Sequence, residues 1–296
     1  MTYIIERVQL YSRGEWITTS LLVEDEKILA VKPCFSKFRY MKMVAENFLM
    51  TPTHVFFTDQ LPHGINHEEY KRFFINHYLF KGCTVLLVAL HVNHHGALFE
   101  EIERAKEFLK QSPLDYTFVV KLPVEQLTVP FIRKTKRMKI PALLVEFNDV
   151  KELYRIPWGW IREALFPYNS PLVPAPSNNH PEQDTLLTSW GKILSREKIP
   201  HIKHPILEKQ PISMDVLTKI GIYPKKGYLH PGGELSYNLY WSSSMKKNHD
   251  DGEQVIDEKN LVITVHKGQL VRVMKKVYWK ESFGEELIVD RPSFFK

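Results

Sequence analysis

The most informative segment of the chain reads Thr51-Pro-Thr-His-Val-Phe-Phe-Thr-Asp-Gln60. Its apolar run predicts a short buried strand over residues 55–58. Polar side chains follow at once, so Asp59 and Gln60 are expected just past the carboxyl end of that strand. In (β/α) barrels this end of the strands carries the chemistry, and the segment is therefore the first place to look for a site.

The middle of the chain alternates short apolar runs with amphipathic segments. A Val- and Leu-rich run over 84–90 predicts a strand that is buried on both faces. A stripe of apolar residues from Leu98 to Leu109 predicts a helix, and Pro157 is expected to kink or split another. The predicted strands are 55–58, 84–90, 116–122, 141–147 and 171–174, and the predicted helices are 67–79, 98–109, 124–138, 150–165 and 185–196.

Strands that alternate with helices at this spacing predict an α/β fold with a parallel sheet, either a closed (β/α) barrel or an incomplete one. Length decides between these architectures. A complete eight-stranded barrel takes roughly 200 to 250 residues, whereas residues 51–215 leave room for about five or six strand–helix units. The sequence therefore predicts an abbreviated barrel whose missing units fall late in the chain.

The segment after Pro52 resembles strand one of the metal-dependent amidohydrolase superfamily, most closely its dihydroorotase and allantoinase branch. There the pattern is Pro-Gly-x-x-Asp-x-His-x-His, and the paired histidines bind a catalytic metal. Counted from Pro52, the aspartate of the pattern falls on Phe56 and its histidines fall on Thr58 and Gln60. A hydroxyl or a carboxamide is a poor substitute for imidazole as a zinc ligand. The resemblance therefore implies a degenerate member that lacks the metal ligands.

Four other segments resemble the same superfamily in the same order along the chain. They are turn-and-strand patterns at 21–31, 81–88, 220–232 and 261–271. The resemblance implies a truncated or incomplete TIM-like (β/α) barrel plus a small β-sandwich built from both termini. The implied domains are 1–50 for the first part of the sandwich, 51–215 for the barrel and 216–296 for the second part of the sandwich.

The resemblance also implies where the remaining metal ligands would lie. In the family they are a carboxylated lysine from strand four, histidines from strands five and six, and an aspartate from strand eight that activates the metal-bound water. The predicted strand 141–147 holds no lysine, and 171–176 offers no histidine at its end. His201 and His204 do not match the family spacing. The implied protein is a pseudoenzyme without a cofactor.

A rebuilt metal site is the alternative. Asp59, His91 and Glu146 are each expected near the carboxyl end of a predicted strand, and together they would suit one divalent metal such as zinc. Asp59 and Glu146 would then be the candidate catalytic residues of a metal-dependent hydrolase of cyclic amide C–N bonds. The competing interpretation is that charged residues past strand ends are solvated or cap the next helix.

Composition is that of an ordinary folded protein, with 296 residues of which 44% are hydrophobic and 25% charged. The net charge of +6 makes nucleic acid a weak alternative, since the one dense basic run, Arg133 to Lys139, is expected on the outer face of a helix. No apolar run is long enough for a membrane helix. The start, Met1-Thr-Tyr-Ile-Ile-Glu-Arg, does not have the layout of a signal peptide, so a cytoplasmic location is expected.

The leading hypothesis from the sequence is an amidohydrolase-like protein that is catalytically inactive and has a small-molecule-binding or protein-interaction role. The resemblance further implies a homo-oligomer or a complex with an active relative. The sequence identifies no particular ligand, because one fold carries many functions.

Overall fold

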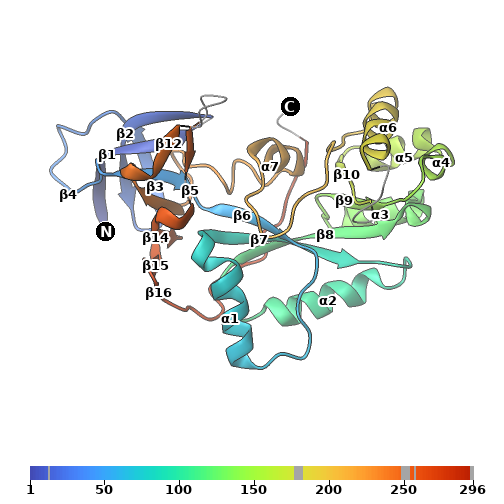
Figure 1. The fold of residues 1–296 in the computed structure, drawn as a ribbon, viewed down its shortest axis with the longest axis horizontal. Coiled ribbons are helices and arrows are strands. Elements are labelled where there is room, and N and C mark those ends of the chain that lie inside the picture. The colour runs from blue at the N-terminus through green and yellow to red at the C-terminus, as the bar shows by residue number, and fades with distance from the viewer. Residues whose placement is uncertain (13, 177–182, 248–253, 257, 294–296) are drawn as a thin grey trace. The chain divides into compact units, whose positions relative to one another are not determined.

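The computed structural model describes residues 1–12, 14–176, 183–247, 254–256 and 258–293 (Figure 1). The chain divides into two units, each made of several segments. Residues 1–55, 65–85 and 225–281 form one, which we call the terminal-strand unit. Residues 56–64, 86–224 and 282–296 form the other, which we call the parallel-sheet unit.

A continuous nine-stranded sheet dominates the terminal-strand unit. Its order is β16-β15-β14-β11-β5-β1-β2-β3, with β4 paired to β1. The antiparallel pairing of β5 with β11 joins the N-terminal strands to the C-terminal ones. The strands of both termini, from which the sequence predicts a sandwich, therefore belong to one hydrogen-bonded sheet. The strands are β1 (Thr2–Ser12), β2 (Glu15–Glu24), β3 (Lys27–Lys32), β4 (Met41–Val44), β5 (Phe48–Pro52), β11 (Tyr237–Trp241), β14 (Leu261–His266), β15 (Gln269–Val273) and β16 (Lys276–Val277), with a separate hairpin of β12 (Met245–Lys247) and β13 (Gln254–Ile256).

The core of this sheet combines residues that are far apart in the sequence. Ile5 and Leu21 from the N-terminal strands pack in one buried cluster with Leu239 and Val265 from the C-terminal strands. Each of these side chains is at most 6% exposed. Their sequence neighbours Ile4 and Leu22 pack in a second buried cluster with Phe35, as expected for strands whose successive side chains point to opposite faces.

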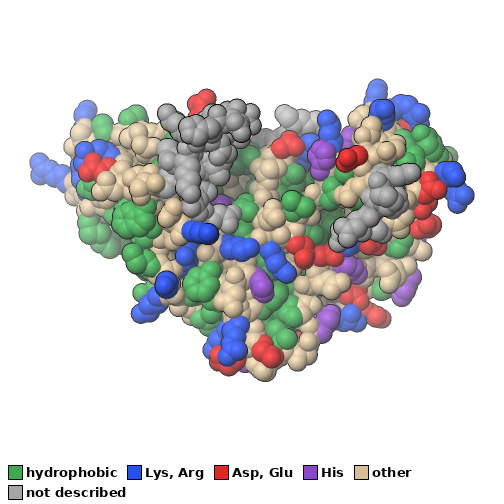
Figure 2. Space-filling view, in the orientation of Figure 1, with side chains coloured by type: hydrophobic (Ala, Val, Ile, Leu, Met, Phe, Trp, Pro, Cys, Tyr) green, Lys and Arg blue, Asp and Glu red, His purple; other side chains and the backbone are tan. Residues whose placement is uncertain are grey.

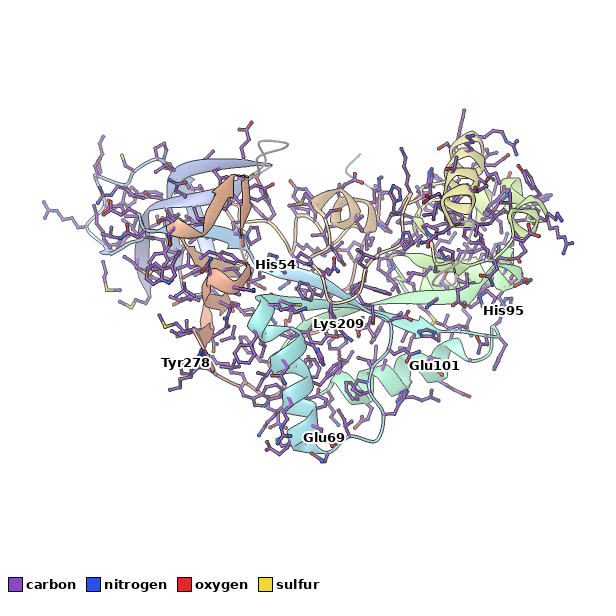
Figure 3. The ribbon with its side chains drawn as sticks, viewed as in Figure 1. His54, Glu69, His95, Glu101, Lys209 and Tyr278 are labelled. Atoms are coloured by element: carbon purple, nitrogen blue, oxygen red, sulfur yellow. The ribbon has the colours of Figure 1, made fainter. Side chains whose placement is uncertain are left out.

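Helix α1 (His67–His77) also belongs to the terminal-strand unit, and it starts at a reciprocal cap. The Asn66 side chain accepts a hydrogen bond from the Glu69 backbone, and the Glu69 carboxylate accepts one from the Asn66 backbone (Figure 3). After the turn η1 (Leu79–Lys81), Gly82 has φ +71, and a Cβ there would lie 2.5 Å from the Asn238 side chain. Only glycine fits at this turn.

A curled half-barrel sheet of parallel strands forms the frame of the parallel-sheet unit. Its order is β10-β9-β8-β7-β6. The strands are β6 (His54–Thr58), β7 (Cys83–His91), β8 (Asp115–Pro123), β9 (Leu143–Glu146) and β10 (Leu172–Pro174), which confirms each predicted strand of this region within a few residues. Strand β7 is buried at every position before His91, as its continuous apolar run predicts.

Helices follow these strands, and their bounds agree with the predicted ones except at the start of α3 and at the break between α4 and α5. In α2, the apolar stripe from Leu98 to Leu109 is buried as predicted. Pro157 separates α4 from α5, which confirms the predicted split. The predicted helix 124–138 is wrong at its start, because Thr128 caps a new helix there. The helices are α2 (Leu98–Leu109), α3 (Val129–Arg137), α4 (Val150–Tyr154), α5 (Trp158–Leu165), α6 (Gln183–Arg196) and α7 (Met214–Ile220), with the turn η2 (Val124–Gln126) before α3.

Both edges of the parallel sheet carry extra backbone pairing. Residues 200–202 run parallel to β10, where the Leu172 N–H donates to Pro200 and the Ile202 N–H donates to Leu172, both at 2.9 Å. At the other edge, the Lys209 N–H donates to Phe57 of β6 at 3.0 Å. The segment between these contacts thus covers both edge strands, which would otherwise expose unpaired backbone groups.

A buried histidine ties β6 to β11 within the terminal-strand unit. His54 Nε2 lies 2.9 Å from the Tyr240 hydroxyl (Figure 3 labels His54). Burial lowers the pKa of His54 to about 4, because the charged imidazolium loses its hydration there. The side chain is therefore neutral in the folded protein at pH 7.

We expect the free energy of unfolding to fall as the pH falls from about 6.5 towards 4. Between these values the unfolded chain binds a proton at His54 that the folded chain does not, which costs at most about 3 kcal/mol of stability. His54→Gln removes this titration, so its stability should change less over the same range. Urea unfolding at pH 7 and pH 5 measures the difference. His67→Gln, at an exposed position, is the control, and an equal slope in wild type and His54→Gln would contradict the prediction.

Candidate functional site

A lysine ammonium lies among carboxylates at the carboxyl ends of the parallel strands. Lys121 near the end of β8 places Nζ 3.0 and 2.8 Å from the two oxygens of Asp59, which follows β6. The same Nζ is 3.6 Å from Glu146, the last residue of β9. We call Asp59, His91, Lys121 and Glu146 the strand-end cluster, because four neighbouring strands supply one residue each.

His91, the last residue of β7, completes this cluster. Its Nε2 lies 2.7 Å from the Asp59 backbone carbonyl, to which it donates, and 3.4 Å from the Asp59 carboxylate. The hydrogen bond to the Asp59 side chain raises the pKa of His91 above its usual value, although burial and the charge of Lys121 act in the opposite direction. The imidazole is accordingly held beside the carboxylate in a fixed orientation.

Asp59 is the centre of the hydrogen-bonding network. Its backbone N–H donates to the Glu208 carboxylate at 2.7 Å. Burial alone would raise the pKa of Asp59, but the hydrogen bonds from His91 and Lys121 and the charge of Lys121 outweigh burial, so its pKa lies below the usual value. The side chains of Asp59 and Lys121 are 25% and 17% exposed, so water screens their attraction only in part.

The structure brings the three sequence candidates to one edge of the sheet, but not into direct contact as a set. Asp59 touches His91, whereas Glu146 reaches the cluster through Lys121. Among the described residues, these three do not offer ligand atoms that all lie within 4.8 Å of one another. Thr58 is fully buried, and its hydroxyl donates to the Gln60 carbonyl at 3.3 Å.

Sequence reasoning missed Lys121 and Glu208. Lys121 stands near the end of an otherwise apolar run, Tyr116 to Leu122. A single lysine in a strand that is buried on both faces is unusual unless a carboxylate pairs with it, and that was the available signal. Glu208 gave no such signal, because it lies in an irregular segment that only the folded chain brings beside Asp59.

A pocket of about 410 Å³ opens beside the strand-end cluster, between the segment after β6, the end of β7 and α2. Its polar wall includes an ion pair on α2, Arg104 to Glu101 at 2.7 Å (Figure 3 labels Glu101). We call this the Asp59 pocket. It is lined by Asp59, Gln60, Leu61, His63, Ala89, Leu90, His91, Asn93, Glu101, Arg104, Ala105 and Phe108.

His95 lies in the loop before α2 and contacts residues near the start of α3. His95 Nε2 lies 3.2 Å from the Gln126 carbonyl and 3.3 Å from the Thr128 hydroxyl, and its ring stacks on Phe131 at 4.8 Å (Figure 3). These contacts fasten the loop to the start of α3. His95 therefore has a structural role.

Two lysines of the basic run in α3 donate hydrogen bonds to backbone carbonyls. Lys134 Nζ donates to the His95 carbonyl at 2.8 Å. Lys136 Nζ donates to the Ala164 and Phe166 carbonyls, at 2.9 and 2.7 Å, where α5 ends. The face drawn in Figure 2 shows lysine and arginine side chains interspersed with acidic ones. These features give no support to the nucleic-acid alternative.

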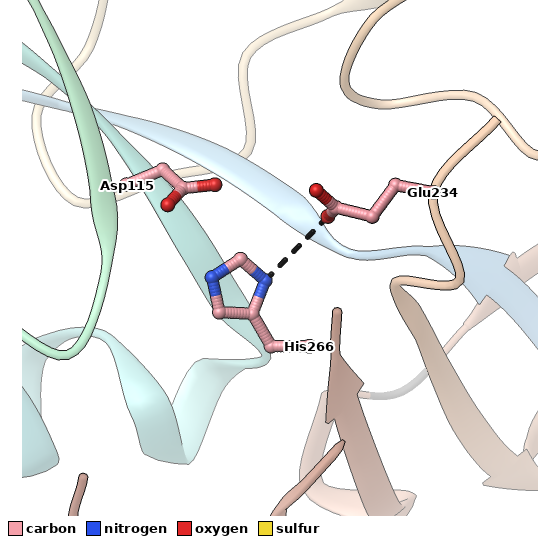
Figure 4. A group of neighbouring side chains, drawn as sticks. All are labelled: Asp115, Glu234 and His266. Atoms are coloured by element: carbon pink, nitrogen blue, oxygen red, sulfur yellow. Dashed lines mark ion pairs between the residues drawn. The ribbon is translucent and has the colours of Figure 1, made fainter. Parts of the chain in front are cut away.

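A polar cluster in the terminal-strand unit has a comparable structural role (Figure 4). Glu234 accepts from Lys226 at 2.6 Å and forms an ion pair with His266 at 3.8 Å. The Ser236 hydroxyl donates to Glu234 and accepts the Lys267 N–H at 2.9 Å. These bonds fasten the turn-rich segment after residue 225 to β14.

The comparisons with known proteins agree with this fold. A dihydropyrimidinase from Brevibacillus agri NCHU1002 superposes with a TM-score of 0.63 at 13% identity, covering 100% of both chains. A D-hydantoinase from Thermus sp. gives 0.63 at 10% identity, covering 99% of this chain and 100% of that one. Another D-hydantoinase structure gives 0.65 at 10% identity, covering 99% of each. No protein-family model matches the chain, and no curated protein matches it by sequence.

At these identities the likeness concerns the fold alone. The chain has a fold similar to that of hydantoinases and dihydropyrimidinases. None of the helices in the described ranges combines the length and apolar character needed to cross a lipid bilayer.

We expect Lys121→Met to lower the free energy of unfolding by about 2 kcal/mol at pH 7, because Asp59 then stays half-buried without its cation. The loss should shrink progressively as the pH falls below about 4, where an unfolded aspartate begins to bind a proton. The stabilisation by Lys121 is lost fully only when the pH falls below the lowered pKa of Asp59 in the folded protein. Urea unfolding at pH 7 and pH 3 measures both values.

The exposed Lys110 offers a matched control for that substitution. Its side chain is 71% exposed, so Lys110→Met should change stability by no more than about 0.5 kcal/mol. Adding Asp59→Asn to Lys121→Met should recover part of the loss, because the unpaired charge is gone. A loss in Lys121→Met that does not depend on pH would show that packing, rather than the ion pair, explains it.

Proposed function

We propose that the chain is a non-catalytic amidohydrolase-like protein in which Lys121 takes the electrostatic place of a metal, and that its Asp59 pocket binds a small polar molecule. The observation that carries the proposal is the position of Lys121 Nζ, within 3.0 Å of both oxygens of Asp59 and 3.6 Å from Glu146. A fixed ammonium neutralises carboxylates as a cation would, but it offers no open coordination position for water.

The residues present do not suit the family's metal. Thr58 and Gln60 stand where the resemblance puts histidines, and the Thr58 hydroxyl is committed to a backbone carbonyl. Any cation at Asp59 would have to displace an ammonium that is already hydrogen-bonded there. Repulsion between Lys121 and a divalent ion at this distance would be large in a partly buried site.

The Asp59 pocket is open and large enough for a small molecule. Its volume of about 410 Å³ falls within the range of typical ligand sites, roughly 300 to 1,000 Å³. Apolar side chains such as Leu90 and Phe108 line it together with donors and acceptors from Gln60, Asn93 and His91. His91 connects the pocket to the strand-end cluster, so a ligand there would contact a group whose orientation Asp59 fixes.

The architecture that supports this role is an abbreviated barrel. We propose that the segment from residue 200 to 211 replaces the missing late strands, because it pairs with β10 at one end and with β6 at the other. The homo-oligomer, or the complex with an active relative, that the resemblance implies remains a prediction of this proposal.

Metal content after incubation with zinc and gel filtration tests the proposal. We expect wild type to retain well under one equivalent by elemental mass spectrometry. Lys121→Gln should retain more zinc than wild type, because the repulsive ammonium is gone while Asp59, His91 and Glu146 remain. One equivalent in wild type that is lost in Asp59→Ala, with hydrolysis of a cyclic amide, would instead establish the rewired hydrolase.

A further inference from the structure

A second pocket lies along α6, in the parallel-sheet unit. It has a volume of about 700 Å³ and lies between the exposed face of α6 and the residues that follow the segment paired with β10. We call it the α6 groove. It is lined by Asp184, Leu187, Thr188, Gly191, Lys192, Ser195, Lys203 and His204, none of which lines the Asp59 pocket.

The helix presents a polar face to the groove and an apolar face to the core. Thr188, Lys192 and Ser195 are spaced i, i+4 and i+7, so they lie on one side of α6. The buried Trp190 of the same helix donates its indole N–H to the Ile202 carbonyl at 2.9 Å. Because Lys203 and His204 follow Ile202 directly, this hydrogen bond fixes one wall of the groove against the other.

Gly191 sits on the groove side of the helix without a structural reason in the described chain. A Cβ built on it meets no heavy atom within 4 Å. Glycine inside a helix costs roughly 1 kcal/mol relative to alanine. No close packing among the described residues requires this cost, whereas a side chain at 191 would project into the groove. The absence of a side chain keeps the groove open.

Among the described residues that line the groove, positive charges outnumber negative ones. Lys192 and Lys203 face one carboxylate there, Asp184, and His204 also lines the space. Neither lysine has an ion-pair or hydrogen-bond partner among the described residues. Lys134, by contrast, donates a hydrogen bond to the backbone carbonyl of His95.

The positive charge of the lysines also affects the pKa of the neighbouring His201. Its pKa lies below the usual value, first because of burial and then because of the positive charges of Lys219 and Lys203, although a hydrogen bond to the Ile199 carbonyl acts in the opposite direction. The groove therefore lies in a region of positive potential, which attracts anions.

We propose that the α6 groove binds a phosphorylated small molecule. Lysine is a common ligand for phosphate because its ammonium acts as a compact charge, and here two lysines reach the same space from opposite walls. The hydroxyls of Thr188 and Ser195 supply neutral donors for phosphate oxygens. The volume suits a small metabolite. This site stands independently of the role proposed for the Asp59 pocket.

Isothermal titration of the full chain with inorganic pyrophosphate tests the proposal. Wild type should bind pyrophosphate, more weakly as the salt concentration rises. The double variant Lys192→Glu/Lys203→Glu should weaken binding at least about tenfold. Lys110→Glu makes the same change of charge on the exposed end of α2 and should leave the affinity within about twofold.

A second variant keeps the test sound if reversing two charges disturbs the fold. Gly191→Leu places a side chain in the groove without a clash in the described chain, so it should weaken pyrophosphate binding while the thermal unfolding temperature stays equal or rises. Absence of binding to wild type, or equal affinity in wild type and both groove variants, would overturn the proposal. Tighter binding of citrate than of pyrophosphate would overturn the assignment to phosphate.

Discussion

The ion pair between Lys121 and Asp59 is the contact on which the strand-end face depends. Parallel strands bring their carboxyl ends to one edge, and three of them end here in or next to ionisable groups. Without a cation, Asp59 would be a half-buried negative charge beside a second carboxylate. Lys121, reaching from the neighbouring strand β8, satisfies Asp59 and approaches Glu146. Within the described chain, Lys121 thus supplies a positive charge to two carboxylates of this face.

Covering the sheet edges is the second constraint, because the half-barrel sheet has two edge strands. Residues 200–202 pair with β10, and Lys209 pairs with β6, so the backbone groups of both edges find partners in the same segment. That segment also delivers Glu208 to the Asp59 backbone and Lys203 to the α6 groove. One irregular stretch of chain therefore supports the sheet and supplies residues to both proposed binding regions.

Several charged or polar side chains outside the two pockets have structural roles. The basic run of α3 holds carbonyl groups near the ends of other elements, and His95 fastens a loop. Glu234 and His266 fasten a turn to its sheet. The lysines of the α6 groove have no such role among the described residues.

The sequence by itself determined the strand and helix pattern, because periodicity, caps and prolines act locally. The stripe from Leu98 to Leu109 and the break at Pro157 are examples. It also placed Asp59, His91 and Glu146 near strand ends. Only the tertiary structure decided that Lys121 lies between two of them and that Glu208 reaches Asp59, since those residues are 62 and 149 positions away from Asp59. Such contacts depend on sheet order and on how an irregular segment crosses it, and no local pattern encodes either.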